Sequence, residues 1–195
     1  DSCYAIEIVL SANGTIRNCA FKPYFEYALS VRYSENIFID QNHFAMGNPD
    51  TGIYMYNATG MIIRGNYFTN CKTGILVAAY SQANWITENQ LVDNHAFGIR
   101  LYSSPLSSQN IIWKNYFQNN QIHASDDEPD NWWFDEGVGN YWDNYTGTDA
   151  NRDGIGDTGY TFSGRGGAID EFPIWDDHAP LLETISPRSS RFYND

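Results

Sequence analysis

The stretch Ile39-Asp-Gln-Asn-His-Phe44 decides the fold, because it recurs along the chain at a nearly constant interval. Clear copies begin at Ile63, Ile86 and Ile112; an earlier copy has Cys19 in the Asn place, and a degenerate copy ends at Trp142. The anchor positions 19, 42, 66, 89, 115 and 140 are 23, 24, 23, 26 and 25 residues apart. A fixed period of this length indicates a solenoid.

A second motif repeats with the same period and alternates apolar with polar residues, as in Gly52-Ile-Tyr-Met55 and Gly74-Ile-Leu-Val77. Alternation of this kind marks strands with one buried face. Leucine-rich repeats are excluded, because their L-x-x-L-x-L frame is absent. The sequence therefore predicts an all-β, right-handed parallel β-helix of five to six coils of ~23 residues, with coils stacked at the ordinary interstrand distance.

The repeated isoleucines and asparagines predict columns that run through the stacked coils. Asn42, Asn66, Asn89 and Asn115 are expected to lie in left-handed turns and to hydrogen-bond to the Asn above and below. This structural role needs no catalytic explanation. We expect coils over residues 1–129, a C-terminal cap over 130–177 and a tail over 178–195.

The amino-acid composition limits the classes of function that the chain can have. The chain has 195 residues with 11 Lys and Arg against 24 Asp and Glu, a formal charge of −13. Such an acidic surface repels phosphate backbones and argues against nucleic acid as a partner. No run is apolar and long enough to span a membrane. The chain starts at Asp1 without Met, which indicates a processed product. The three cysteines, an odd number, are interpreted as small buried apolar residues.

The segment 149–157 has the spacing of a calcium loop, with oxygen ligands at positions 1, 3, 5, 7 and 9 and glycine at position 6. The missing acid at position 12 is expected to be replaced from the cap. The predicted ligands are Asp149, Asn151, Asp153, the Ile155 carbonyl, Asp157 and Asp170. No flanking helices are expected, so calcium would act as a structural staple; the alternative is a metal-free surface turn.

The coils and the C-terminal block resemble the carbohydrate-binding and sugar-hydrolase (CASH) type of β-helix, which includes the NosD-like proteins and many archaeal surface proteins. The most specific part of the resemblance is the block from Gly139-Asn-Tyr-Trp142 to Asp153-Gly-Ile-Gly-Asp157, which is similar to the end of β-helices in archaeal surface proteins. The resemblance implies a β-helix and an exported, extracellular or cell-surface location. It implies no single activity, because the group ranges from enzymes to scaffolds.

Two outward columns on the Gly-Ile strands predict a ligand face of stacking rings and hydrogen-bonding cations, which suits sugars. Its residues are Arg32, Tyr54, Tyr56, Arg100 and Tyr102, and His123 is expected to end the Tyr54 column. A second outward column is apolar and predicts a protein interface; it consists of Phe38, Ile62, Trp85 and Ile111. Possible glycosylation sequons start at Asn13, Asn57 and Asn144.

The favoured function is a non-catalytic, calcium-stabilised β-helix module for assembly with itself or another surface protein, or for contact with polysaccharide. The alternative is a polysaccharide-active lyase, epimerase or hydrolase. The acidic run Asp126-Asp-Glu-Pro-Asp130 does not by itself supply two carboxylates across a bond, and we expect it to be a solvated loop or to add calcium ligands. A metal-delivery role by analogy with NosD is not favoured, because no His, Met and Cys cluster for copper is evident.

Overall fold

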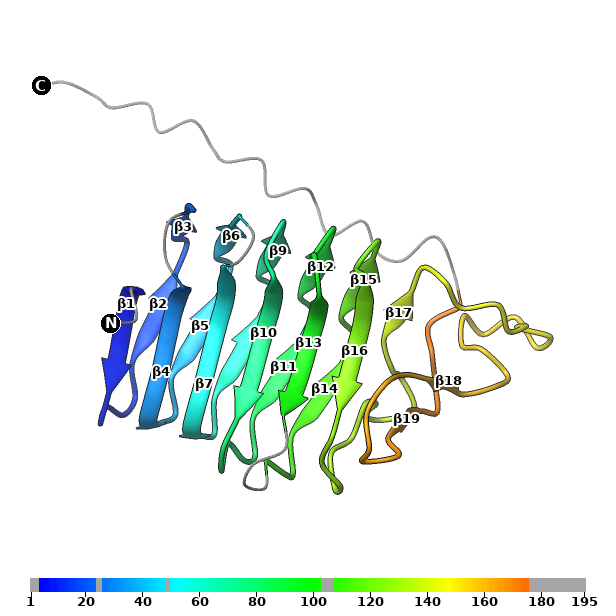
Figure 1. Ribbon diagram of the computed structural model, residues 1–195. Helices are drawn as coiled ribbons and strands as arrows, with labels where there is room; N and C mark the ends of the chain where they lie inside the picture. The colour runs from blue at the N-terminus through cyan, green and yellow to red at the C-terminus, as the bar shows by residue number, and fades with distance from the viewer. Residues whose placement is uncertain (1–3, 24–25, 48–49, 103–106, 176–195) are drawn as a thin grey trace, which may run out of the picture.

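A computed structural model describes residues 4–23, 26–47, 50–102 and 107–175. Three parallel sheets run along the molecule, and successive coils stack side by side (Figure 1). Sheet A, in spatial order, contains β1 (Tyr4–Val9), β4 (Tyr27–Glu35), β7 (Thr51–Thr59), β10 (Thr73–Ala78), β13 (Phe97–Tyr102) and β16 (Ile122–Asp126). The predicted parallel β-helix is confirmed.

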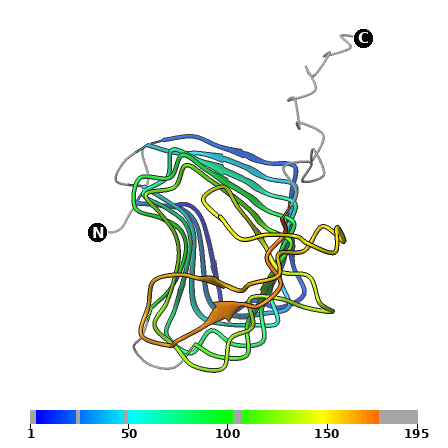
Figure 2. The ribbon, with the colours of Figure 1, turned by 90° about the vertical axis from the view of Figure 1, so that its right-hand side faces the viewer.

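Each coil adds one strand to each sheet. Sheet B contains β14 (Ile111–Trp113), β11 (Trp85–Thr87), β8 (Ile62–Arg64), β5 (Phe38–Asp40) and β2 (Thr15–Arg17). Sheet C contains β17 (Tyr141–Trp142), β15 (Tyr116–Gln118), β12 (Gln90–Val92), β9 (Tyr67–Thr69), β6 (His43–Ala45) and β3 (Ala20–Phe21). The antiparallel pair β18 (Tyr160–Thr161) and β19 (Ile169–Asp170) crosses the C-terminal end (Figure 2).

The core consists of columns of equivalent side chains held in register. In sheet B, Ile39, Ile63 and Ile86 pair directly with one another along the stack. In sheet C, the Phe44 ring stacks on Phe21 and Phe68, with centroids 4.5 and 4.7 Å apart. These spacings match the interstrand distance, so the apolar period of the sequence becomes one continuous core.

Asparagine side chains connect the coils at the corner between sheets B and C. The Asn66 Nδ2 donates to Asn89 Oδ1 (3.0 Å), and the Asn66 backbone N–H donates to the same oxygen (2.9 Å). The pattern repeats from Asn42 to Asn140, which confirms the predicted column.

The expected backbone of these asparagines was wrong, because the residue before each Asn carries the positive φ. These residues are Gln41, Gly65, Glu88 and Lys114, with φ from 53° to 62°. The left-handed residue turns the chain at the corner, and the following Asn therefore points inward to its neighbours.

Two further asparagine columns occupy the other corners. One runs through Asn84, Asn110 and Asn131, and the other through Asn94 and Asn120. Cysteines stand at the N-terminal start of two columns: the backbone N–H groups of Cys19 and Cys71 donate to Asn42 and Asn94. Both thiols are free, and burial raises the pKa of Cys71 to about 12. Cys3 lies outside the described residues.

Aromatic residues close the C-terminal end of the core. Trp142 is buried, and its ring stacks on Phe117 at 4.3 Å and on Tyr160 at 4.3 Å. Trp133 is also buried, whereas Trp132 is 46% exposed and lies outside this plug. The plug therefore shields the last coil from solvent without a helix.

Candidate functional site

The structure brings the predicted tyrosines and arginines together on the outer face of sheet A. Arg32 pairs with Tyr56, which pairs with Ala78, which pairs with Tyr102, so these residues form one straight column. Tyr54 and Arg100 lie in the neighbouring column, with Leu76 between them. We call the five residues Arg32, Tyr54, Tyr56, Arg100 and Tyr102 the tyrosine–arginine face.

Each arginine of this face lies against an aromatic ring. The Arg100 guanidinium carbon is 4.7 Å from the ring centroids of both Phe97 and Tyr102, and that of Arg32 is 5.5 Å from Tyr56. Arg32 also pairs with Glu7 at 3.6 Å. The Nε atoms of both arginines are buried and have no hydrogen-bond partner among the described residues. These two Nε groups are therefore buried donors, and only the outer guanidinium nitrogens are left to meet a ligand.

A cavity of about 360 Å³ lies next to the N-terminal part of the face. The Tyr33 ring belongs to its wall and contacts Tyr56 edge-on at 5.4 Å. The other lining residues are Leu10, Ser11, Ala12, Ser34, Glu35, Asn57 and Thr59. The face thus continues into a polar hollow at the corner between sheets A and B.

His123 does not belong to this face. Arg100 pairs with Ser125, two residues further on than expected, and His123 takes the place that Gly52, Gly74 and Gly98 hold in earlier coils. The residue is 7% exposed, and its ring lies near Phe117 and Trp142. The sequence signal was the Gly-Ile motif, whose last copy reads His123-Ala124.

His123 forms a hydrogen-bonded pair with Asp143 in the cap, with Nε2 and Oδ1 2.8 Å apart. The Asn120 side chain lies 3.3 Å from Nδ1. Burial lowers the pKa of His123, although Asp143 acts in the opposite direction. Sequence reasoning missed this pair, because its members lie in different structural units.

In the predicted calcium loop, carboxylate oxygens accept backbone amides. Asp149 accepts from the N–H groups of Asp153 and Gly154 at 3.1 and 2.9 Å, and Asp157 Oδ2 accepts from Ala150 at 2.9 Å. Asn151 donates to Asp153 Oδ2 at 2.9 Å. Among the described residues, no group of three or more His, Cys, Asp or Glu side chains is arranged to hold a metal ion.

The backbone of this loop nevertheless has the expected turn. Gly154, at position 6, has a φ of +85°, and its carbonyl accepts from the Trp175 N–H at 2.9 Å. Ile155 forms an antiparallel bridge to Ile174. The loop is therefore tied to the segment that follows β19, although its side chains are turned towards its own backbone.

Asp170 lies at the end of an asparagine column and not among the loop side chains. It is fully buried, and its Oδ2 accepts from the Asn140 N–H at 2.7 Å and from Trp142 Nε1 at 2.9 Å. Burial raises its pKa to about 6, although these hydrogen bonds act in the opposite direction. Asp170, which we predicted to be a metal ligand, thus completes the asparagine column instead.

The acidic run is not the solvated loop that we expected. Asp126 is 1% exposed and accepts from Trp133 Nε1 at 2.9 Å and Asn131 Nδ2 at 3.2 Å. Burial raises its pKa to about 6. Glu128 is 2% exposed, and Asp127 lies 3.6 Å from Arg165. Two of these acids are buried because the chain turns inward here to start the cap.

The predicted apolar column is in register on the outer face of sheet B. Phe38 pairs with Ile62, which pairs with Trp85, which pairs with Ile111. Ile62 and Trp85 are 39% and 47% exposed. The column is therefore a surface feature, and its role as an interface stays a prediction.

The three sequon asparagines lie at the surface to different degrees. Asn13 and Asn144 are exposed, and Asn57 is half-buried in the wall of the polar hollow. Asn144 accepts from the Tyr160 hydroxyl at 2.8 Å. Glycosylation at these positions stays a prediction. In the described part of the chain, no helix is long and apolar enough to cross a membrane.

In the comparison with known proteins, the chain matches the model of one family. Residues 1–147 match the model of the family described as "Periplasmic copper-binding protein (NosD)". A probable ABC transporter binding protein NosD of Stutzerimonas stutzeri is 29% identical over 114 residues, which is 58% of this chain and 20% of that protein. The corresponding protein of Pseudomonas aeruginosa is 28% identical over 114 residues, 21% of its length. The chain spans about a fifth of these relatives.

The described residues do not fit the copper site that this description implies. Copper prefers clustered imidazole, thiolate or thioether ligands. Here Met46, Met55 and Met61 are buried in the hydrophobic core, and Cys71 begins an asparagine column. His43 and His123 lie on different strands, β6 and β16. No grouping of histidine, cysteine and acid side chains within the described ranges could hold a metal.

The family match ends at residue 147, before the predicted calcium loop, so closeness to archaeal surface proteins stays a prediction. Within the match lie the Asn-centred coils, the asparagine columns and the three parallel sheets. The match covers well over half of the chain and agrees with the fold. This chain belongs to the NosD family.

Proposed function

We propose that this chain is a non-catalytic module of an exported protein, and that it binds a polysaccharide on the tyrosine–arginine face. The observation that carries the proposal is the placement of Arg32 and Arg100 on one face of sheet A, each against a tyrosine ring. Rings stack on sugar faces, and a guanidinium fork pairs with a carboxylate. The periplasmic description of the family supports export; the cell surface is our narrower proposal.

The geometry of the face suits an extended polymer rather than a single small molecule. Arg32 lies on β4 and Arg100 on β13, three strand steps away, or ~14 Å at the usual interstrand spacing. Tyr54 and Tyr56 lie between them on β7, with ring centroids 6.4 Å apart. A chain of sugar units that crosses the strands would meet cation, ring and cation in turn.

Binding to polygalacturonate, measured by calorimetry, tests this function. Arg100→Ala together with Tyr102→Ala is expected to weaken binding by about tenfold or more, since one lost charged hydrogen bond and one lost ring contact suffice for that. Lys114→Ala, a cation outside the face, is the matched control. The same incubations should release no new reducing ends or unsaturated products; turnover would favour the polysaccharide-active enzyme instead.

We further propose that calcium stabilises the loop at 149–157. Support comes from the ligand spacing, from the glycine turn and from Asp149, whose oxygens already hold the Asp153 and Gly154 amides. Binding requires the Asp153 and Asp157 carboxylates to rotate away from their present donors. We also propose the division into coils (1–129), cap (130–177) and tail (178–195); all of the tail lies outside the described residues.

Chelation is the test of the calcium proposal. A ligand that binds only the native state adds about 2.7 kcal/mol at 100 times its Kd, so excess EGTA should lower the melting temperature of the chain. Asp153→Ala should abolish this sensitivity, whereas Asp93→Ala, an exposed acid far from the loop, should retain it. Equal melting temperatures with and without EGTA for the unmodified chain would refute calcium binding.

A further inference from the structure

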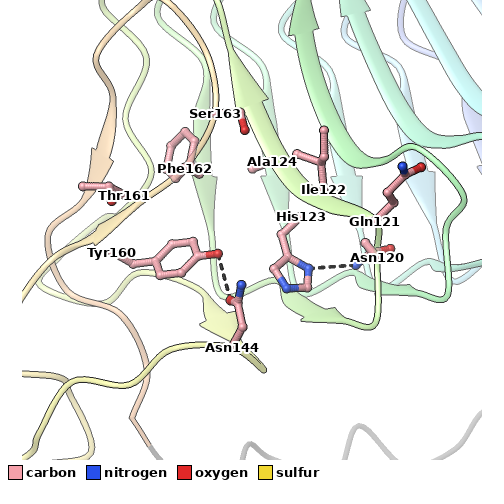
Figure 3. A pocket seen from close by; sticks show the side chains of 10 residues that line it. All are labelled: Asn120, Gln121, Ile122, His123, Ala124, Asn144, Tyr160, Thr161, Phe162 and Ser163. Atoms are coloured by element: carbon pink, nitrogen blue, oxygen red, sulfur yellow. Dashed lines mark hydrogen bonds between the residues drawn. The ribbon is translucent and has the colours of Figure 1, made fainter.

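A second cavity, of about 360 Å³, lies where the cap separates from the last coil (Figure 3). One wall is Asn120–Ala124, the turn into β16 and the start of that strand; the other is Tyr160–Ser163 with Asn144. Ser163 forms a bridge to Ser125 and so closes one end of the cavity. The cavity is thus built by two fixed elements of the fold, and its volume falls at the low end of small-molecule sites.

The lining of this cavity is polar but uncharged. It contains three amides, three hydroxyls, two aromatic rings and one imidazole, and none of its ten residues is Asp, Glu, Lys or Arg. The Asn120 amide donates to His123 Nδ1, so Nε2 carries the hydrogen that faces Asp143. His123 is therefore a neutral, fixed part of the wall. A charged ligand would find no counter-charge in this lining.

The asparagine column that ends at Asn120 leaves a donor next to this cavity. In that column, the backbone N–H groups of Cys71 and Asn94 donate to the next Asn, at 3.0 and 3.1 Å. The equivalent N–H of Asn120 has no such acceptor among the described residues, although the residue is buried. By contrast, the column through Asn140 ends on Asp170. A ligand hydroxyl would supply the missing acceptor.

We propose that this cavity binds one neutral sugar residue. Figure 3 shows the Tyr160 and Phe162 rings on one side and Asn120, Gln121 and His123 on the other. The rings offer apolar contact to a sugar face, and the amides of Gln121 and Asn144 can both donate and accept, as hydroxyls require. The site is separate from the tyrosine–arginine face, which has cations and suits an extended polymer. It therefore does not depend on the proposed function of that face.

Saturation-transfer NMR with the full chain tests this site. The probes are the methyl glycosides of glucose, galactose and mannose, N-acetylglucosamine, and glucuronate as the charged comparison. We expect at least one neutral sugar to bind with a millimolar Kd and glucuronate to bind more weakly. Asn144→Ala and Gln121→Trp should each weaken binding by about tenfold, which corresponds to one lost hydrogen bond or a filled cavity mouth.

Both substituted residues are exposed, so their variants should fold, and melting curves check this. Lys114→Ala, which lines neither site, is the control and should leave sugar affinity unchanged. Tyr102→Ala on the tyrosine–arginine face tests whether the sugar binds there instead. The proposal is overturned if no neutral sugar binds, if the two cavity variants bind normally, or if Tyr102→Ala abolishes the signal instead. The last outcome would place the sugar on the face and leave the proposed function standing.

Discussion

Asn89→Ala is expected to be the most destabilising single truncation of a polar side chain in the coils. Asn89 is fully buried; its Oδ1 accepts from the Asn66 N–H, and its Nδ2 donates to the Ile63 carbonyl at 2.9 Å. Alanine at position 89 leaves the Asn66 N–H and the Ile63 carbonyl buried without hydrogen-bond partners. Each orphaned group costs about 1–3 kcal/mol, so we expect a loss of about 3–5 kcal/mol in the free energy of unfolding.

Urea denaturation followed by circular dichroism measures this loss. The matched control is Gln90→Ala, the next residue along the chain, which is half-buried on β12. Its substitution should change stability by less than about 1 kcal/mol, because it is not part of a column. If Asn89→Ala lowers the free energy of unfolding by no more than Gln90→Ala does, the asparagine columns result from the stacking of the coils and do not stabilise that stacking.

The second large effect is a dependence of stability on pH that comes from Asp126 and Asp170. The native pKa of each is raised from 3.8 to about 6. A raised pKa means that the native state binds the proton more tightly than the unfolded state does. The stability that each protonated carboxyl group contributes is therefore fully present below pH 4 and is lost as the pH rises through 6. One pKa unit corresponds to about 1.4 kcal/mol, so each group can contribute about 3 kcal/mol.

Urea midpoints between pH 4.5 and 7.5, with EGTA present throughout, measure this effect. His43 and His123 have lowered pKa values and act in the opposite direction below pH 6.5, so the unmodified chain shows only the sum. The comparison with Asp170→Asn removes this ambiguity. In that variant, the gain in stability on going from pH 7.5 to pH 4.5 should be about half of the gain in the unmodified chain. This holds even if the variant is less stable at every pH. An unchanged slope would show that Asp170 is ionised at no cost in the native state.

Much of the fold could be predicted because the same sequence motif occurs in nearly every coil. The copies of Ile39–Phe44 give the period, the sheet register and the column through Asn42 and Asn115. The sequence also placed Phe38, Ile62 and Trp85 on one outer face, because strand alternation leaves no other side for them. A repeated position is predictable because one geometric rule applies to every copy.

The errors arose where the repeat breaks. His123 was assigned to the outer face because the longer spacing between its coil and the previous one shifts the register by two residues. Asp126 and Asp170 could not be recognised as buried, because their partners Trp133 and Asn140 lie 7 and 30 residues away and follow no period. Contacts that the cap makes once leave no pattern in a single sequence.

The asparagine columns have a direction, and this direction bears on how the chain matures. In the column from Cys19 to Asn140, every side-chain oxygen accepts from the coil before it, and the final acceptor is Asp170. The residue that terminates this column is therefore synthesised after all the coils. An emerging chain can stack its coils early, but the last buried amides stay unsatisfied until the carboxylate at 170 arrives. Completion of this column thus follows synthesis of all the coils that it connects.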